Sequence, residues 1–124
     1  MKKAIVVLGL LFISSIVYAK SLKCVCYEGQ KLVNSYDRIE LVEEKDPVRF
    51  AKGEGLSSLK FSTRQLKLVV RAILNEGNPL IRLETYDVIY KTYHWISVKG
   101  TKLEYDAQFP NADDNVELSC GVVK

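Results

Sequence analysis

Two short stretches decide the fold: LKCVC at positions 22–26 and VELSCGV at positions 116–122. In both stretches apolar residues alternate with other residues, which is typical of a β-strand with one buried face. The apolar face carries Cys24 and Cys26 in the first stretch and Cys120 in the second. If these two strands are neighbours, their cysteine Cα atoms come within the about 5.5–6 Å that a disulfide requires. The sequence therefore predicts a bridge from Cys120 to either Cys24 or Cys26, with one cysteine left over.

The first 19 residues have the composition of a secretory signal peptide. Two lysines follow Met1, residues 4–19 carry no charge, and this run ends in Val17-Tyr18-Ala19. We predict cleavage after Ala19 and export to the periplasm or the extracellular space. An uncleaved membrane anchor is disfavoured, because the apolar run would reach only about 24 Å as a helix, short of the ~30 Å hydrocarbon core.

Removal of the signal peptide changes the charge balance of the chain. The full sequence has 18 Lys and Arg against 15 Asp and Glu. Lys2 and Lys3 leave with the signal, so the mature chain 20–124 retains 16 cations against 15 anions. A near-neutral chain without a clustered positive field does not favour nucleic acid as a partner. The mature chain is long enough for one domain with one core, and no second apolar run is long enough to span a membrane.

The second half of the chain is expected to consist of strands and hairpins. In residues 101–109, Thr101 and four apolar residues alternate with charged and amide side chains, and residues 88–98 are rich in β-branched and aromatic side chains. Lys99-Gly100 between them is a hairpin signal, and residues 80–85 form a further expected strand after a turn-rich segment. The predicted fold is all-β: an antiparallel barrel or sandwich of about seven to eight strands. The disulfide between the terminal strands closes it.

One segment fits two periodicities. As a helix, residues 64–74 would place five apolar side chains on one stripe, with Ser62 and Gln65 as a capping box and Gly77 beyond the end. As a strand, the same residues alternate and form a hairpin with residues 80–85. We favour the strand because the flanking elements are strands and antiparallel neighbours are the default connection. The alternative is an α+β fold with a helix at 63–76.

An aromatic cluster is the strongest candidate for a binding site. Tyr86, Tyr90, Tyr93, His94 and Trp95 fall within ten residues. On one strand, Tyr93 and Trp95 would share a face, and Tyr86, Tyr90 and His94 would share the other. Aromatic side chains with a polar tip bury much area at little entropic cost, so we predict binding through Tyr93 and Trp95, with Tyr90 and His94 beside them. The alternative interpretation is that these residues only stabilise cross-strand pairs.

Metal binding is not expected. Cys24 and Cys26 with His94 and Cys120 offer soft ligands, but two cysteines two positions apart and a single histidine form a weak pattern. The turn at 111–115 offers oxygen atoms without the regular spacing of a calcium loop. We therefore predict neither a metal ion nor another cofactor.

Charged residues form two further stretches. An acidic stretch lies at 40–46, and Lys60, Arg64, Lys67 and Arg71 form a basic one with 4-3-4 spacing. Either stretch is suited to a charged partner, but solvated faces are the more common use of such patterns, and exposed ion pairs contribute little to stability.

No catalytic motif is present in the sequence. His94 is the only histidine, and neither a GxSxG nor an HExxH motif occurs. We therefore predict a small exported, non-enzymatic binding protein that acts as an inhibitor or recognition module for another protein. In layout this is similar to the periplasmic lysozyme inhibitors, which are also small, β-rich and disulfide-closed. The alternative is a lipocalin-like carrier of a small apolar ligand.

Overall fold

The computed structural model describes residues 20–52, 58–109 and 115–123. The predicted signal peptide and most of the 111–115 turn lie outside these ranges. Among the described residues, no helix has the length and apolar character needed to cross a membrane.

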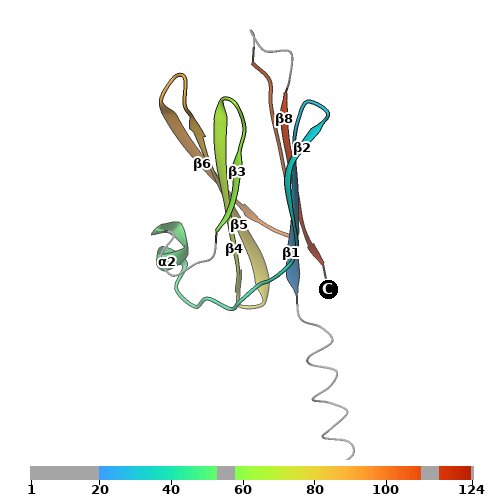
Figure 1. The fold of residues 1–124 in the computed structure, drawn as a ribbon. Helices are drawn as coiled ribbons and strands as arrows, with labels where there is room; N and C mark the ends of the chain where they lie inside the picture. The colour runs from blue at the N-terminus through green and yellow to red at the C-terminus, as the bar shows by residue number, and fades with distance from the viewer. Residues whose placement is uncertain (1–19, 53–57, 110–114, 124) are drawn as a thin grey trace, which may run out of the picture.

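Within the described ranges, eight strands form two four-stranded antiparallel sheets packed as a sandwich (Figure 1). The first sheet has the order β2-β1-β8-β7, and the second sheet has the order β3-β4-β5-β6. The strands are β1 (Ser21–Glu28), β2 (Lys31–Glu40), β3 (Leu59–Ser62), β4 (Leu66–Asn75), β5 (Asn78–Asp87), β6 (Thr92–Lys99), β7 (Lys102–Ala107) and β8 (Val116–Val123). The all-β prediction is confirmed, and of the two expected architectures the protein adopts the sandwich.

The segment that fitted both periodicities is strand β4. Leu66, Leu68 and Val70 are buried between the sheets, while Lys67 is exposed on the opposite face. β4 pairs with β5 over its whole length and with β3 at positions 67–70, and near its end the Leu74 N–H donates to the Val42 carbonyl at 3.0 Å. The alternative of a helix at 63–76 is therefore wrong.

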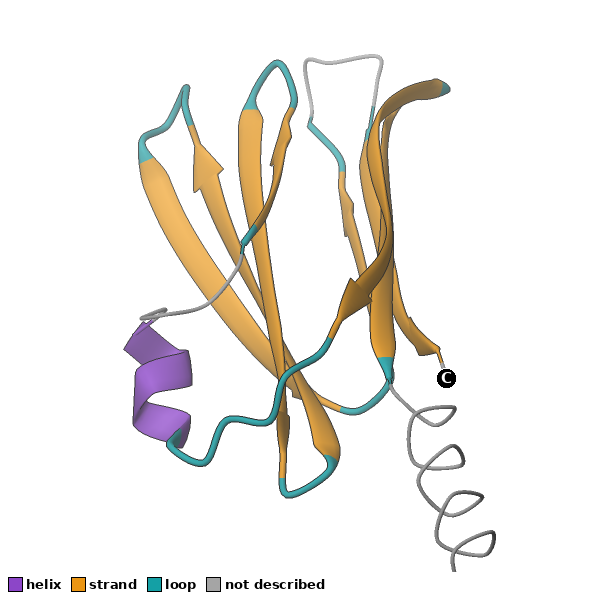
Figure 2. Ribbon diagram, turned by 60° about the horizontal axis from the view of Figure 1, so that its bottom comes forward, coloured by secondary structure: helices purple, strands orange, loops and turns teal. Residues whose placement is uncertain are grey.

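A short helix that the sequence analysis did not predict, α2 (Pro47–Lys52), follows β2. It lies on the outer side of the second sheet, away from the first sheet (Figures 1 and 2). The Asp46 carboxylate accepts a hydrogen bond from the Val48 N–H at 2.9 Å, and proline occupies the first helical position. Phe50 on this helix and Ile73 on β4 are both buried, although neither belongs to the core between the sheets.

The strand expected over 88–98 is interrupted by a turn. Residues 88–91 connect β5 to β6, and β6 begins only at Thr92. The Asp87 carboxylate accepts hydrogen bonds from the backbone N–H groups of Ile89 (2.9 Å) and Tyr90 (3.0 Å), and Lys91 has a left-handed φ of 57°. Asp87 is a usual turn residue, but the left-handed position is held by Lys91 in place of the glycine or asparagine that usually occupies it, which is why the sequence pattern did not reveal the turn.

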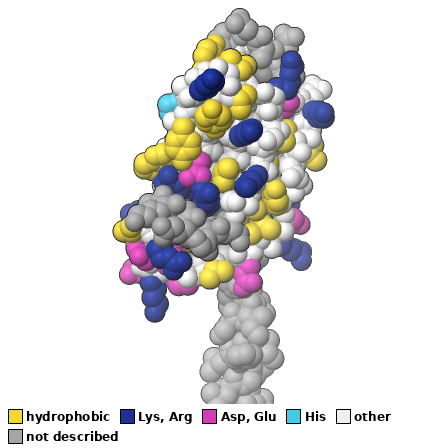
Figure 3. All heavy atoms as spheres, turned by 60° about the vertical axis from the view of Figure 1, so that its left-hand side comes forward, with side chains coloured by type: hydrophobic (Ala, Val, Ile, Leu, Met, Phe, Trp, Pro, Cys, Tyr) yellow, Lys and Arg dark blue, Asp and Glu magenta, His cyan; other side chains and the backbone are white. Residues whose placement is uncertain are grey.

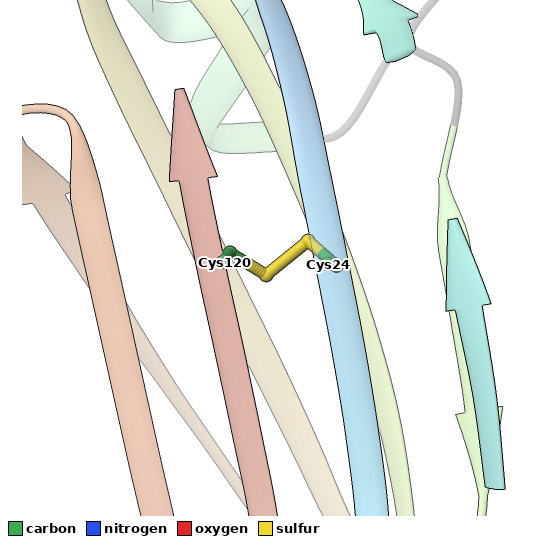
Figure 4. Close-up of a disulfide and its surroundings, with 2 residues drawn as sticks. All are labelled: Cys24 and Cys120. Atoms are coloured by element: carbon green, nitrogen blue, oxygen red, sulfur yellow. A yellow bond between two sulfur atoms is a disulfide. The ribbon is translucent and has the colours of Figure 1, made fainter. Parts of the chain in front are cut away.

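The core lies between the two sheets, and the disulfide lies within it. β1 and β8 pair so that Cys24 is directly opposite Cys120, while Cys26 is opposite Leu118. The bridge joins Cys24 to Cys120, with a Cα–Cα distance of 4.1 Å (Figure 4). This register answers the question that the sequence left open, and Cys26 remains as a buried thiol.

The two sheets meet along one side, where β2 approaches β3. The ring of Tyr36 contacts that of Phe61 edge-to-face, with centroids 5.3 Å apart, and its hydroxyl donates a hydrogen bond to the Lys60 carbonyl at 3.1 Å. The second sheet therefore has one edge close to the first sheet, and its opposite edge is β6.

Candidate binding surface

Strand β6 is exposed on both of its faces. Every residue from Thr92 to Ser97 is exposed, whereas β4 and β5 each bury one face against the core. Tyr93 is 54% exposed, Trp95 55% and Ile96 45%. Figure 3 views this side of the molecule and shows hydrophobic side chains interspersed with Lys and Arg. β6 thus extends beyond the part of the second sheet that the first sheet covers.

The exposed apolar side chains around the β5–β6 hairpin form one surface, which we call the aromatic surface. It consists of Tyr86, Ile89, Tyr90, Tyr93 and Trp95. Tyr86 and Tyr93 are direct cross-strand partners, and Trp95 follows Tyr93 on the same face of β6.

The structure separates the residues predicted to bind. Tyr93 and Trp95 lie together on the outer face of the second sheet, as expected from their spacing. Tyr90 lies in the turn rather than on a strand. His94 is exposed on the opposite face of β6, where its neighbours in the strand are Ile96 and Val98.

Charged residues of β4 and β5 hold the aromatic side chains in place. The Arg82 guanidinium lies 4.3 Å from the centroid of the Trp95 ring, an arrangement that favours a cation–π interaction. Arg82 is only 7% exposed, and its Nε donates a hydrogen bond to Glu84 Oε1 at 3.3 Å. The Tyr93 hydroxyl donates to the same carboxylate oxygen at 2.9 Å, and Arg71 pairs with the other oxygen. One carboxylate therefore joins two arginines and one tyrosine.

These contacts also change the pKa of the Glu84 carboxyl group. Burial acts to raise the pKa of Glu84, but the hydrogen bonds from Tyr93, Arg71 and Arg82 and the charge of Arg71 outweigh it. The pKa of Glu84 consequently lies below its ordinary value, so this group is ionised at neutral pH.

Sequence reasoning missed Arg82 and Glu84. Both belong to an ordinary alternating strand, and nothing nearby in the sequence links them to Trp95. The link is the register of β5 and β6, which places Glu84 directly opposite Trp95. The 4-3-4 spacing of the basic residues did signal Arg71, but as part of a charged stretch and not as a partner of the aromatic side chains.

A hollow lies between the end of β2 and strands β3 and β4. It has a volume of about 160 Å³, with an apolar lining that includes Ile39, Leu41 and Leu59. Glu40, Glu43 and Glu44 also line it. Cavities that hold small organic ligands are usually about 300–1,000 Å³. This hollow has less room than such a ligand requires.

Two further candidates for chemistry are a metal site and the thiol of Cys26. Among residues 20–52, 58–109 and 115–123, no group of three or more His, Cys, Asp or Glu side chains is arranged to hold a metal ion. Burial, with a smaller contribution from Glu28, raises the pKa of the Cys26 thiol to about 11. At neutral pH this cysteine is therefore protonated and a poor nucleophile.

No protein-family model, curated protein or solved structure matches this chain.

Proposed function

We propose that this chain is a small exported, non-enzymatic binding protein that recognises another protein through the aromatic surface. The observation that carries the proposal is the position of Tyr93 and Trp95. Both rings are about half exposed, yet their orientation is restrained by Glu84 and Arg82. Aromatic side chains that are already ordered lose little entropy on binding, and Trp, Tyr and Arg are the residues most enriched among energetic hot spots of protein interfaces.

Two features support export. Residues 4–19 form an uncharged, mostly apolar run that two lysines precede, and a disulfide joins β1 to β8. Structural disulfides persist in oxidising compartments, which are the periplasm, the secretory pathway and the extracellular space.

The shape of the surface favours a protein over a small molecule. The aromatic side chains lie on an exposed strand and its turn rather than inside a cavity. The hollow beside β2, at about 160 Å³, has little room for the ligand of a carrier. A hollow of about 350 Å³, lined by Tyr27, Glu104 and Glu117 among others, lies over the outer face of the first sheet and not between the sheets, where a carrier would hold its ligand.

Site-specific crosslinking in the producing cells tests this proposal. A photoreactive phenylalanine analogue at Tyr90 should yield a discrete crosslinked product with one other protein, because Tyr90 lies at the rim of the aromatic surface. The same analogue at Ser119, exposed on the outer face of the first sheet, is the matched control and should yield none. Adding Trp95→Ala to the Tyr90 variant should abolish the product. Equal labelling from both positions, or no product from Tyr90, would contradict the proposal.

A further inference from the structure

We propose that the partner contributes an extended, acidic segment that adds to the free edge of β6 as a fifth strand of the second sheet. This inference rests on the proposed function and specifies how the partner is recognised. The occupant is a segment of another protein and not a second copy of this chain.

The backbone of β6 presents unpaired groups along its outer edge. The His94 carbonyl accepts a hydrogen bond from the Thr85 hydroxyl at 3.5 Å, and the Gly100 N–H donates to the Pro79 carbonyl at 3.0 Å. Residues 94 and 100 therefore direct their backbone groups toward β5. Because these directions alternate along an antiparallel strand, Tyr93, Trp95 and Ser97 direct their N–H and C=O groups away from β5. No described residue pairs with this edge.

The other three sheet edges carry features that discourage strand addition. β3 has only four residues and approaches β2. β2 is interrupted by two register shifts, and Arg38 within it has a left-handed φ of 57°. β7 has six residues and exposes charged side chains.

β6 differs from the other three edge strands in length, in the regularity of its pairing and in its lack of charged side chains before Lys99. Its eight residues pair with β5 without a register shift, and residues 92–98 (TYHWISV) contain no Lys, Arg, Asp, Glu, Pro or Gly. Within the described part of the chain, it is the edge best suited to accept another strand.

The charges around β6 favour an acidic segment. Lys91 precedes the strand and Lys99 ends it, and Arg71 and Arg82 on β4 and β5 share the carboxylate of Glu84. With the carboxylate of Asp87 at the β5–β6 turn, four positive groups stand against two negative ones. This local excess of positive charge contrasts with the near-neutral mature chain. A partner of opposite charge gains affinity and association rate from such a field, whereas a second copy would bring two positive edges together.

The two faces of β6 further define the pattern of the added strand. On the outer face its side chains would adjoin Tyr93 and Trp95, which suits aromatic residues, while its ends would lie near Lys91 and Lys99, which suits Asp and Glu. On the other face they would adjoin Ile96, which is 45% exposed and suits apolar residues. The expected segment therefore alternates acidic or aromatic residues with apolar ones.

Phage display tests the proposal. Random twelve-residue peptides are selected for binding to the disulfide-bonded mature protein. Selected peptides should show the alternating acidic–apolar pattern, and synthetic copies should change the fluorescence of Trp95, the only tryptophan. Ser97→Pro removes one outward N–H that β5 does not use, so it should lower peptide affinity about tenfold. Ser97→Ala keeps this N–H and should leave the affinity unchanged. Circular dichroism and thermal unfolding verify that both variants remain folded.

The absence of selected peptides, or peptides that bind Ser97→Pro as tightly as the unmodified protein, would overturn strand addition. Selected peptides without an acidic excess would overturn the acidic character of the segment. Self-association of the protein that Ser97→Pro abolishes would also overturn the proposal, by showing that a second copy occupies the edge. A crosslink from Tyr90 whose yield is the same in Ser97→Pro as in the protein with Ser97 would leave the proposed function intact while refuting strand addition. If the protein with the photoreactive analogue at position 90 and no other change gives no crosslinked product, the proposed function itself is refuted.

Discussion

The two cysteines of β1 allow a direct comparison between a crosslinked and an unlinked position. Cys24 and Cys26 lie on the same buried face, two residues apart, and only Cys24 is bridged to Cys120. Replacing each with alanine removes a buried sulfur, but only Cys24→Ala also removes the crosslink. The difference between the two variants therefore isolates the contribution of the disulfide.

The expected magnitudes follow from the structure. The bridge joins residues separated by 96 positions. For a loop of this length, the chain-entropy relation predicts about 4.7 kcal/mol of stabilisation at about 25 °C. Cys26→Ala should cost only about 1 kcal/mol, comparable with the loss of one buried methyl group. Cys24→Ala should therefore lower the free energy of unfolding by about 5–6 kcal/mol.

Urea denaturation followed by far-ultraviolet circular dichroism measures the free energy of unfolding of both variants. Alkylation with mass spectrometry counts their free thiols. Cys24→Ala should present two alkylatable thiols after unfolding and Cys26→Ala none. A replacement Cys26–Cys120 bridge is not expected, because diagonal neighbours in a sheet lie about 7–8 Å apart, beyond the usual disulfide range. Loss of the bridge in Cys26→Ala, or similar costs for the two variants, would refute this reasoning.

Three further predictions concern the core, the buried thiol and the carboxylate beneath the aromatic surface. Phe61→Ala should lower the free energy of unfolding by about 3–5 kcal/mol in urea denaturation, because Phe61 is buried where the sheets meet. Cys26 in the folded protein should react with iodoacetamide only slowly at pH 8 and faster near its pKa of about 11. Because the pKa of Glu84 is lowered by folding, its contribution to stability is present above its ordinary pKa of 4.5 and is lost as the pH falls through the lower folded value. The thermal midpoint of the unmodified protein should therefore fall more steeply in acid than that of Glu84→Gln.

Each of these predictions has a matched control or a contradicting result. Phe61→Leu keeps most of the buried volume and should cost clearly less than Phe61→Ala. Rapid alkylation of Cys26 at pH 8 under native conditions would show that the thiol is not shielded by the fold. Parallel acid profiles for Glu84→Gln and the unmodified protein would show that the contacts of this carboxylate do not stabilise the folded state.

The sequence alone determined the class of the fold because alternation along a strand is a local property. The segments around Cys24 and Cys120 alternate with a period of two, so each had to bury one face, and both cysteines lay on it. For β4, alternation competed with a helical stripe, and the strand could be chosen only from its neighbours. The turn at 88–91 escaped prediction because a lysine, Lys91, holds the left-handed position that a glycine usually marks.

Tertiary structure decided which residues meet. The register of β1 against β8 selected Cys24 over Cys26, although both fit the same pattern. The pairing of β5 with β6 brought Glu84 and Arg82 to Tyr93 and Trp95. Register and sheet order depend on contacts between residues far apart in the chain, which no local pattern encodes. For the same reason the sequence predicted the aromatic residues as a cluster, while only the packing of the two sheets left β6 exposed on both faces.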